Sequence, residues 1–549
     1  MADATPPGPA GPDFDFDYLI IGSGFGGSVS ALRLTERGNR VGVVEMGRRW
    51  SPDNLPSTNW IFWRFLWRPM IGLRGFFNVR PFRHVMILHG NAVGGGSITY
   101  ANTLLVPPEK VWDEGSWAGL DDWHRVMPGH YATARRMLGV TPNKRLAAAD
   151  YTLRKMADNH GVGDSFYPTD VGVFFGKDGE PEGKAYPDPY FGGEGPERNS
   201  CIGCGGCMVG CRHNAKNTLD KNYLYLAEKR GARVYAETEV VDLRPLDGRE
   251  DGAGGYEVHT VKSTAWFNRQ PRRYTARSVV FAAGSLGTQQ LLFKLKQSGS
   301  LPNISDQLGN RVRTNAESLI GIRMPKAKED MSKGVAIGSG IYIDEHTHVE
   351  ATRYPANSDL LSFTFTPLTD GKPNWTRILL WLWTFLLLLL TRPLLTLRAI
   401  NPVGFAKQTM ILLCMQTLDG FLNMRFRRPW YNPFTKVLVT EGDPIPTYIP
   451  AANEFARKSA ALVDGIACSG VTEILFNIPM TAHCMGGCAM ADTPERGVID
   501  RQNRVFGYRN MYVCDGSMLG SNLGVNPSLT ITALAERAMS FIPPAKAAN

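Results

Sequence analysis

The stretch DYLIIGSGFGGSVSALRLTERGNRVGVVEMG, residues 17–47, decides the fold of this chain. An apolar strand runs into Gly22, Gly24 and Gly27 in G-x-G-x-x-G spacing, and a helix and a second strand follow. Glycines at these positions permit a tight turn and let the backbone approach a pyrophosphate, which the N–H groups of the helix N-terminus can bind. Glu45, after the second strand, stands where a carboxylate accepts hydrogen bonds from an adenosine ribose. The stretch therefore predicts a Rossmann-like dinucleotide-binding unit.

Three further glycine-rich segments occur along the chain, and both NAD and FAD fit the fingerprint near its start. The segments are HGNAVGGGSITYAN (89–102), VVFAAGSLGTQQLL (279–292) and NMYVCDGSMLGSNLGVNPSLTITALAERA (510–538). The last two have the pattern of a strand, a turn of small residues and a helix. Glycine-rich turns distributed in this way indicate a long cofactor that is bound by discontinuous pieces of one domain.

The composition is that of a globular protein with more than one domain, since the chain has 549 residues, of which 43% are hydrophobic. The 60 Lys and Arg residues exceed the 51 Asp and Glu residues, but the excess is spread along the chain and does not indicate nucleic-acid binding. The N-terminal sequence MADATPPGPAGPDFDFD lacks the pattern of a signal peptide, and the cysteines number nine, which is odd. We therefore expect a cytoplasmic location, where disulfide bonds are rare.

The chain resembles the glucose–methanol–choline (GMC) flavoprotein oxidoreductases, and within them the bacterial cholesterol-oxidase-like branch. The resemblance extends from about residue 15 to the C-terminus. It is specific at five motifs, which are the Gly22–Glu45 fingerprint, Gly90-x-x-x-Gly94-Gly95-Gly96-Ser97, the Ala282–Gly287 turn, His483-x-x-Gly486-Gly487, and Asp515-Gly516 with Gly524-Val525-Asn526-Pro527.

The resemblance implies FAD as the cofactor, with the loop 94–102 beside the isoalloxazine ring and Asp515 near the ribityl chain. The residues that it implies for FAD binding are Gly22, Gly24, Gly27, Glu45, Gly94, Gly95, Ser97, Asn102, Ala283, Gly284, Asp515, Gly516 and Asn526.

The same resemblance implies an α/β fold (α+β overall), in which a mainly antiparallel substrate domain is interleaved with a Rossmann-like FAD-binding domain. The expected segments are a flexible tail (1–14), the FAD-binding domain in three parts (15–120, 201–310 with a cysteine-rich loop, and 475–549 with the catalytic residues), a lid segment of the substrate domain (121–200), and a substrate-binding domain (311–474) with an apolar membrane-contact segment (377–393).

The segment TAHCMGGCAM (481–490) places His483 just before two glycines, where the backbone can approach a flat ring. An alcohol that gives a hydride to a flavin must also lose its O–H proton, and histidine can accept a proton near neutral pH. His483 aligns with the active-site histidine of the family, and Asn526 aligns with the asparagine that hydrogen-bonds the substrate oxygen or the flavin. From the residues alone, a core histidine and a helix-capping asparagine are the alternative interpretation.

The chain departs from the family at one point. Cholesterol oxidases that also isomerise the steroid double bond use a glutamate at the start of an inserted strand. The nearest counterpart here, AKQTMILLCMQTLDG (406–420), offers Lys407, Gln408 and Thr409 and no carboxylate. Neither lysine nor glutamine can shuttle the proton as a carboxylate would. The isomerase step, and cholesterol itself as the substrate, are therefore open questions.

Two apolar segments indicate contact with a membrane. RILLWLWTFLLLLLTRP (377–393) contains a run that only Thr384 interrupts and that is shorter than the roughly 20 residues needed to cross a bilayer. NWIFWRFLWRPMIGLRGFF (59–77) interleaves tryptophan with arginine, which is a composition typical of membrane interfaces. The alternative is a buried core helix with an aromatic cluster near the cofactor. We expect peripheral contact with the inner face of the cell membrane, from which a water-insoluble alcohol would enter the site.

The stretch CIGCGGCMVGC (201–211) contains four cysteines in the spacing of bacterial ferredoxins, except that Arg212 replaces the usual proline. Paired C-x-x-C zinc motifs are normally ~15–20 residues apart, so zinc fits this spacing poorly. The two remaining alternatives are an iron–sulfur cluster, which some GMC dehydrogenases carry, and a bare loop of small buried residues. The candidate ligands are Cys201, Cys204, Cys207 and Cys211.

The leading hypothesis is an FAD-dependent oxidoreductase that oxidises the hydroxyl of a sterol or other lipophilic alcohol by hydride transfer to flavin, with His483 as base and oxygen as one possible acceptor. A second hypothesis is a dehydrogenase that passes electrons through an iron–sulfur cluster to a quinone or a protein. A third, of another class, is a non-catalytic flavoprotein that serves as an electron relay or a lipid carrier. The presence of both His483 and Asn526 counts against this third class, because a relay needs neither.

Overall fold

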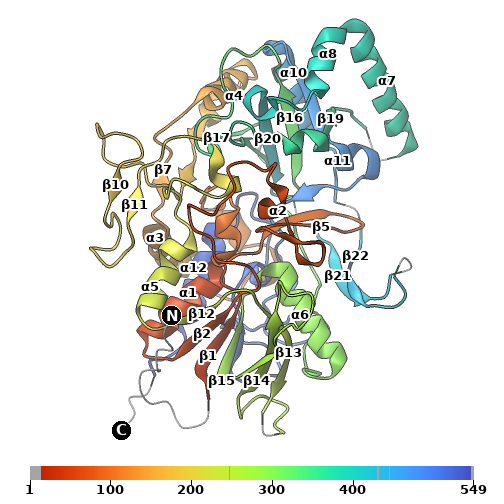
Figure 1. Cartoon of the computed structure of the whole chain (residues 1–549). Coiled ribbons are helices and arrows are strands. Elements are labelled where there is room, and N and C mark those ends of the chain that lie inside the picture. Colours follow the sequence, from red (N-terminus) through yellow and green to blue (C-terminus); the bar gives the residue numbers. More distant parts are fainter. Residues whose placement is uncertain are drawn as a thin grey trace.

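The computed structural model describes residues 14–246, 248–371, 374–418, 420–429, 432–443 and 445–545. Two large β-sheets organise these residues and lie toward opposite ends of the molecule (Figure 1). The predicted tail 1–14 lies, except for Phe14, outside the described residues. The predicted domain boundaries stay predictions, but the sheets show which parts of the chain come together.

The first sheet joins strands from the beginning, the middle and the end of the chain. Its order is β12-β2-β1-β15-β14-β13, and β25 also pairs with β15. The pairs that involve β1, β2, β12 and β25 are parallel, whereas β13, β14 and β15 pair antiparallel. The bounds are β1 Phe16–Ile21, β2 Val41–Val44, β12 Arg233–Tyr235, β13 Thr238–Pro245, β14 Tyr256–Lys262, β15 Arg272–Phe281 and β25 Met511–Val513.

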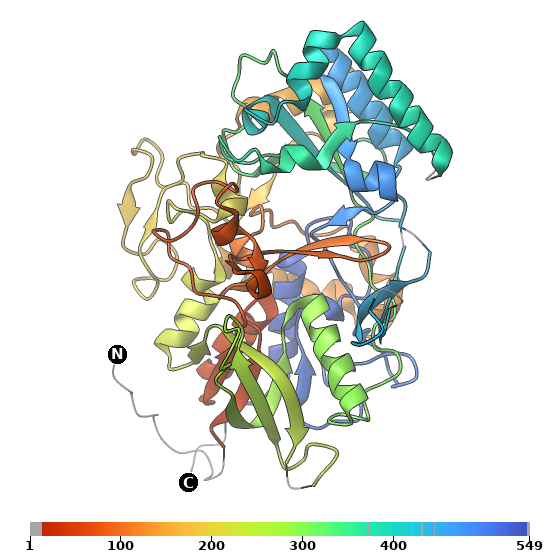
Figure 2. The same cartoon turned by 45° about the vertical axis from the view of Figure 1, so that its right-hand side comes forward.

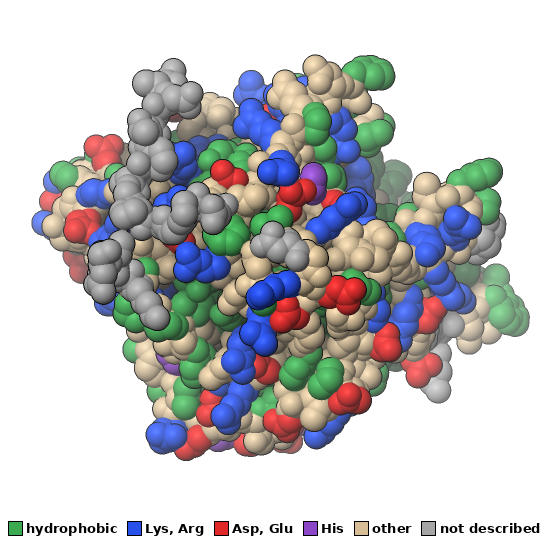
Figure 3. Space-filling view, turned by 90° about the horizontal axis from the view of Figure 1, so that it is seen from below, with side chains coloured by type: hydrophobic (Ala, Val, Ile, Leu, Met, Phe, Trp, Pro, Cys, Tyr) green, Lys and Arg blue, Asp and Glu red, His purple; other side chains and the backbone are tan. Residues whose placement is uncertain are grey.

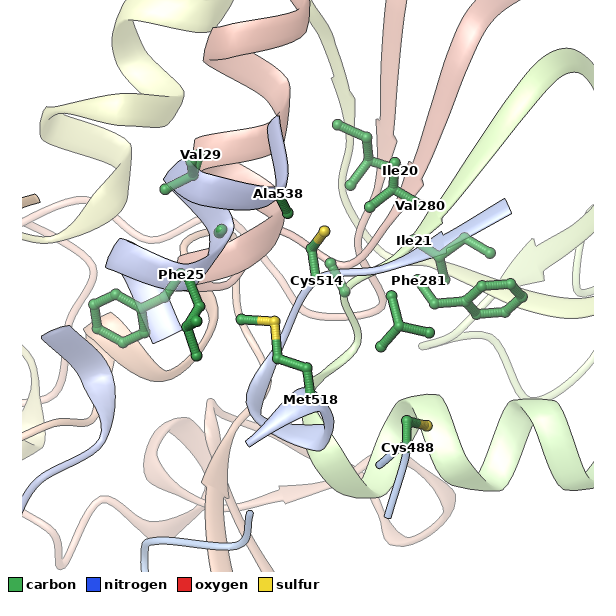
Figure 4. Packing of buried hydrophobic residues seen from close by; sticks show 14 of the residues in the cluster. Ile20, Ile21, Phe25, Val29, Val280, Phe281, Cys488, Cys514, Met518 and Ala538 are labelled. Atoms are coloured by element: carbon green, nitrogen blue, oxygen red, sulfur yellow. The ribbon is translucent and has the colours of Figure 1, made fainter. Parts of the chain in front are cut away.

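Helices cover this sheet and enclose its core. Four of them pack against one another, namely α1 Phe25–Glu36, α3 Trp123–Leu138, α5 Tyr223–Lys229 and α12 Ser528–Ser540, while α6 Gly284–Ser298 contacts β13 (Figure 1). Figure 4 shows part of the core, to which Ile20 of β1, Phe281 of β15, Val29 of α1 and Ala538 of α12 all contribute. Burying each large apolar side chain contributes roughly 1.5–3 kcal/mol. The predicted Rossmann-like part is therefore confirmed as one body built from distant segments.

The turn after β1 has a conformation that only glycine adopts easily. Gly22 has a φ of +105°, and a Cβ at this position would lie 2.3 Å from the carbonyl oxygen of Ala282. The turn between β1 and α1 therefore touches the turn between β15 and α6, backbone against backbone. This contact places the N-termini of α1 and α6 close together at one edge of the sheet.

The second sheet is antiparallel throughout, in the order β19-β23-β16-β20-β18-β17-β8. Helices α4 Ala148–Asn159 and α10 Pro450–Leu462 pack on it and share its core. The predicted interleaved, mainly antiparallel architecture is thus confirmed. The bounds are β8 Tyr167–Pro168, β16 Ser318–Arg323, β17 Ile337–Tyr342, β18 Thr347–Thr352, β19 Phe365–Pro367, β20 Thr409–Gln416 and β23 Ile466–Gly470.

The apolar segment 377–393 lies in two helices, α7 Trp375–Thr391 and α8 Pro393–Ile400, which form an outer pair beside the second sheet (Figure 2). Within α7 only Arg377 is buried, and Trp383 and Leu390 are 60% and 70% exposed. The alternative of a buried core helix is therefore wrong. In the described part of the chain, every helix is too short or too polar to span a membrane.

The segment 59–77 also presents aromatic side chains to the surface. Trp60 and Trp63 are 40% and 54% exposed, on or beside the short helix α2 Phe62–Phe65. The ring of Trp60 lies 6.0 Å from the ring of Phe363, which belongs to the turn η8 Leu360–Thr364 and is itself exposed. This segment and η8 therefore form one exposed aromatic surface.

At the end of the molecule that carries the first sheet, far from α7 and α8, basic and acidic side chains are mixed. Figure 3 shows the face below the first sheet, where lysine and arginine side chains lie among acidic and apolar ones. The excess of basic residues thus stays dispersed on this face.

The four clustered cysteines surround a cavity of only about 20 Å³, which has room for about one water molecule. Cys201 and Cys207 pack among apolar side chains of the same cluster, and burial raises the pKa of both thiols, which disfavours the thiolate that metals bind. Within the described ranges, no group of three or more His, Cys, Asp or Glu side chains could hold a metal ion. The structure therefore does not support the hypothesis of an iron–sulfur cluster, because the loop is packed too tightly for one.

We expect the purified protein to contain no iron or acid-labile sulfide, and Cys207→Ser to cost about 1–3 kcal/mol in the free energy of unfolding, because a hydroxyl replaces a thiol in an apolar cluster. Iron analysis and urea unfolding followed by fluorescence measure these two quantities. Stoichiometric iron in the parent that is lost in Cys207→Ser would show that the loop rearranges to hold a cluster.

Candidate active site

A cavity of about 450 Å³ is lined by residues from both sheets. One part of its wall consists of the turns that follow β1 and β15, and another part consists of Leu319, Ile337 and Leu413 on the second sheet. A cavity of this size with a largely apolar wall and a few polar groups is typical of cofactor and substrate sites.

The two glycine-rich loops at the N-terminal part of the chain meet at the cavity. A Cβ on Gly95 would lie 2.5 Å from the Cα of Gly24, so the loops touch backbone to backbone. Ser23 joins them, because its hydroxyl donates to Glu45 Oε2 at 2.7 Å and accepts the N–H of Gly94 at 3.0 Å. Burial raises the pKa of Glu45, although the N–H of Gly47 and the Ser23 hydroxyl oppose this effect. Ser23 was not predicted from the sequence.

Asp515 closes the cavity from the C-terminal part of the chain. Its Oδ2 accepts the Thr288 hydroxyl at 2.5 Å, and its Oδ1 accepts the N–H of Ser517 at 2.8 Å. Burial raises the pKa of Asp515, and these hydrogen bonds counteract that effect. Because Thr288 lies on α6, Asp515 is held against the turn at Gly284.

The structure brings most of the predicted cofactor residues to this one cavity. Those that line it are Gly22, Gly24, Glu45, Gly95, Ala283, Gly284, Asp515, Gly516 and Asn526. Four others lie behind its wall, namely Gly27, Gly94, Ser97 and Asn102. Ser97 there holds the loop, since its hydroxyl donates to Gly94 O at 2.6 Å and accepts the N–H of Leu219 at 3.0 Å. The individual roles of these residues stay predictions.

These residues fit FAD. The N-termini of α1 and α6 both lie at the cavity, and a Cβ on Gly284 would meet nothing within 4 Å, so the backbone there is open to a ligand. Two open helix N-termini with glycines supply N–H groups for a pyrophosphate. Glu45 supplies a buried carboxylate for a ribose.

His483 lies in the cavity wall just after the short strand β24 Met480–Thr481, and it is buried. Its Nδ1 forms an ion pair with Glu317 Oε1, and its backbone N–H donates to Thr481 Oγ1 at 2.9 Å. The side-chain amide nitrogen of Asn315 also lies 3.2 Å from Nδ1. The closer carboxylate favours the tautomer with the proton on Nδ1, which leaves Nε2 free as an acceptor.

Burial disfavours the charged form of His483, but the Glu317 and Glu350 carboxylates together outweigh burial and raise the pKa of His483 above its ordinary value. His483 is therefore a stronger base than a free histidine. The alternative of a core histidine without chemistry explains neither the carboxylate pair nor the cavity at its ring.

Asn526 lies in the cavity wall beside a second carboxylate. Its Nδ2 donates to Glu350 Oε2 at 3.3 Å. The N-cap residue of α12 is Pro527, and no side chain caps this helix, so the helix-capping interpretation of Asn526 is wrong. Asn315 connects Asn526 to His483, because its Nδ2 also donates to the carbonyl oxygen of Val525 at 2.9 Å.

Sequence reasoning missed Asn315, Glu317 and Glu350. The sequence carries no clear signal for the two glutamates, because their burial appears only in the structure, where each stands in or beside a strand whose other residues are almost all buried. A buried acid in such a strand needs a partner, and that partner is often a functional group.

Comparison with known proteins agrees with this geometry. Residues 196–313 and 453–535 match the family described as GMC oxidoreductase. A cholesterol oxidase of Acinetobacter baumannii is 63% identical over 531 residues, which are 97% of this chain and 95% of that protein. A cholesterol oxidase of Mycobacterium tuberculosis (strain ATCC 25618 / H37Rv) is 47% identical over 96% of this chain and 91% of its own length.

Among solved structures, pyridoxine 4-oxidase from Mesorbium loti has a TM-score of 0.59 at 15% identity, and the match covers 95% of this chain and 98% of that one. This likeness shows the fold. With relatives 63% and 47% identical over almost its whole length, the chain belongs to the GMC oxidoreductase family, in its bacterial cholesterol-oxidase-like branch, and is an FAD-dependent oxidoreductase that acts on CH–OH donors.

Proposed function

We propose that the protein oxidises the hydroxyl of a sterol to a ketone and passes the electrons to oxygen. The observation that carries this proposal is the buried His483–Glu317 pair at a cavity whose opposite wall is apolar. The names of the two relatives that are 63% and 47% identical support the sterol and the oxidase activity. An apolar wall suits a large neutral alcohol, because it offers no partner for a charged substrate.

His483 is the proposed base of this reaction. Its Nε2 accepts the proton of the substrate hydroxyl while Glu317 holds the Nδ1–H tautomer and stabilises the imidazolium that forms, as a carboxylate does in other histidine-based sites. FAD, when bound along the glycine turns, supplies the acceptor for the hydride. Asn315 holds the 524–526 turn beside His483, since its Nδ2 donates to Val525 O and its Oδ1 accepts the N–H of Gly524.

The other hypotheses have less support. No described group of side chains could hold the cluster that the quinone-linked dehydrogenase requires, so quinone as the acceptor rests on no observation. A relay or lipid carrier does not need a paired buried base. The missing carboxylate at Gln408 leaves the isomerase step open, because the cavity face of β20 presents Ile411 and Leu413.

The second part of the proposal is contact with a membrane through α7, α8 and the 59–77 segment. These elements expose leucine and tryptophan together with the basic side chains of Arg64 and Arg398, which suits an anionic lipid surface. Turn η8 connects this surface to the site, since Leu361 lines the cavity and Phe363 in the same turn is 63% exposed. A sterol could therefore pass from lipid to the cavity along η8. The inner face of the cell membrane as the location stays a prediction.

We expect His483→Ala to bind FAD and to slow flavin reduction by roughly 10²–10⁴-fold, the usual contribution of a general base. Anaerobic stopped-flow absorbance with cholesterol measures this rate. Reduction at the parental rate would show that His483 is not the base.

In Glu317→Gln we expect the acid limb of the rate profile to lie at lower pH than in the parent. A base works when it is deprotonated, and loss of the carboxylate removes the main group that raises the pKa of His483. The measurement is the pH dependence of flavin reduction. An unchanged midpoint would mean that Glu317 does not set the basicity of His483.

We expect the combined substitution of Trp383, Leu386 and Leu390 by glutamate to weaken binding to vesicles of anionic phospholipid by more than about tenfold, with a native flavin spectrum, because these side chains are 60%, 46% and 70% exposed. Co-sedimentation measures the binding. The matched control is Phe434→Glu, since Phe434 is 87% exposed in the loop before strand β22 Val437–Glu441, outside the proposed membrane surface. Equal binding of the parent and the combined variant would refute this membrane surface.

A further inference from the structure

The register of the second sheet shows which side chains face the cavity. Leu413 of β20 lies between Leu319 of β16 and Glu350 of β18, and the next cavity-facing residue of β18 is Thr352. Residues directly opposite in antiparallel strands point to the same face. Leu319, Leu413 and Thr352 line the cavity, so Glu350 also points to the cavity side.

The carboxylate of Glu350 accepts fewer hydrogen bonds than that of Glu473, another buried glutamate of the same region. Its Oε2 accepts Asn526 Nδ2 at 3.3 Å, and its Oε1 is buried without a hydrogen-bond partner among the described residues. Glu473, also fully buried, accepts the hydroxyls of Ser318 and Ser469 and a backbone N–H. Burial raises the pKa of both carboxyls to about 7, so the pKa alone does not distinguish them. The difference is that the partner of Glu350 is a cavity residue.

Few groups around Glu350 change charge near neutral pH. His483 forms the ion pair with Glu317, and burial lowers the pKa of His348 on β18 to about 4, which keeps that ring neutral. Tyr167 on β8 and Tyr342 on β17 also face Glu350, and burial raises the pKa of both phenols. Besides the His483–Glu317 pair, Glu350 is therefore the group whose ionisation can respond to pH in this region.

We infer that Glu350 is a positioning residue whose protonation state decides which edge of the Asn526 amide faces the substrate oxygen. An ionised Glu350 accepts the N–H of Asn526 and leaves Oδ1 for the substrate, and this Oδ1 is buried without a partner among the described residues. A protonated Glu350 instead donates its O–H to Oδ1, and a half-turn of the amide presents its N–H to the cavity. The terminal torsion of asparagine is roughly two-fold, so both orientations are accessible.

The protonated form is the productive one. This step of the argument rests on the proposed function, in which the substrate hydroxyl gives its proton to His483 Nε2 and the carbon that bears it gives up a hydride, for which FAD would be the acceptor. The oxygen then has no proton to donate and develops into a carbonyl oxygen, which needs a hydrogen-bond donor. The Asn526 N–H supplies that donor, whereas Oδ1 would repel the oxygen. Activity therefore falls as Glu350 ionises, while the deprotonation of His483 raises it.

The test compares the parent with Glu350→Gln, in which the side-chain N–H of glutamine donates to Asn526 Oδ1 at every pH. Flavin reduction by cholesterol is measured anaerobically from about pH 6 to about pH 9. In the parent we expect a bell-shaped profile, with a loss of about tenfold per pH unit above about 7. In Glu350→Gln we expect the rise that His483 produces and no fall above it.

A second measurement does not depend on turnover. Binding of the ketone cholestan-3-one to the oxidised holoenzyme is followed by the flavin difference spectrum. In the parent, Kd weakens by about 3–10-fold between about pH 6 and about pH 9, which corresponds to the loss of one hydrogen bond. In Glu350→Gln it stays constant. The matched control is Glu473→Gln, which removes a buried carboxyl of similar pKa away from the cavity and should keep the parental profiles.

A parental fall in Glu350→Gln, or a fall that disappears in Glu473→Gln, overturns the inference. A flat alkaline limb in the parent overturns it as well. If the parent is reduced by 1-octanol and not by cholesterol, the sterol assignment fails by itself, and the same pH comparison with 1-octanol still decides the role of Glu350.

Discussion

The arrangement depends on turns of the chain that touch backbone to backbone, where a side chain would force them apart. A Cβ on Gly22 would lie 2.3 Å from Ala282 O, and one on Gly26 would lie 1.7 Å from the carbonyl oxygen of Cys514. These contacts join the beginning of the chain to its middle and its end. They hold the first sheet together as one body and leave the second sheet as an insertion between its parts. The cavity lies where the two bodies meet, so the glycine turns define one of its walls and strands of the other sheet define the opposite wall.

The wall that the glycine turns form could be predicted from short stretches of sequence, because each turn depends on residues that are close together in the chain. The turn at residues 22–27 follows a strand and begins a helix, and glycine spacing reports this geometry directly. The resemblance to a known family supplied the rest of the wall, including the turns at Gly284 and Asp515, which come from distant segments. His483 and Asn526, which the resemblance implied as catalytic residues, line the same cavity, and their roles stay predictions. The antiparallel character of the second sheet followed from the same source.

The opposite wall was not predictable in this way, because it depends on strand register. Glu317 and Glu350 face the same cavity only because β16 and β18 both flank β20, and residues 317 and 350 show no pattern that reveals this pairing. The hypothesis of an iron–sulfur cluster at residues 201–211 lacks support for a related reason. The cysteine spacing matches that of ferredoxins, but ligand spacing does not report the volume that the surrounding side chains leave, and here it is about 20 Å³. The exposure of helix α7 could not be predicted either, because its sequence has no polar face. Only the structure shows that its apolar side chains lie at the surface.

The charges of the site limit what can react there. His483 brings one positive charge when protonated, and Glu317 and Glu350 each bring one negative charge when ionised. The site is thus neutral or anionic in the states that leave His483 able to accept a proton. A substrate carboxylate or phosphate near it would be repelled in a cavity where burial weakens screening. The part of the wall on the second sheet is apolar, since Leu319, Ile337, Ile411 and Leu413 form it, whereas the basic side chains Arg80 and Lys294 belong to strand β5 Phe77–Pro81 and helix α6. These two constraints, one electrostatic and one hydrophobic, both select an uncharged alcohol with a large apolar body. Such a molecule concentrates in a lipid membrane, and the surface next to η8 exposes the leucine and tryptophan side chains that suit contact with one.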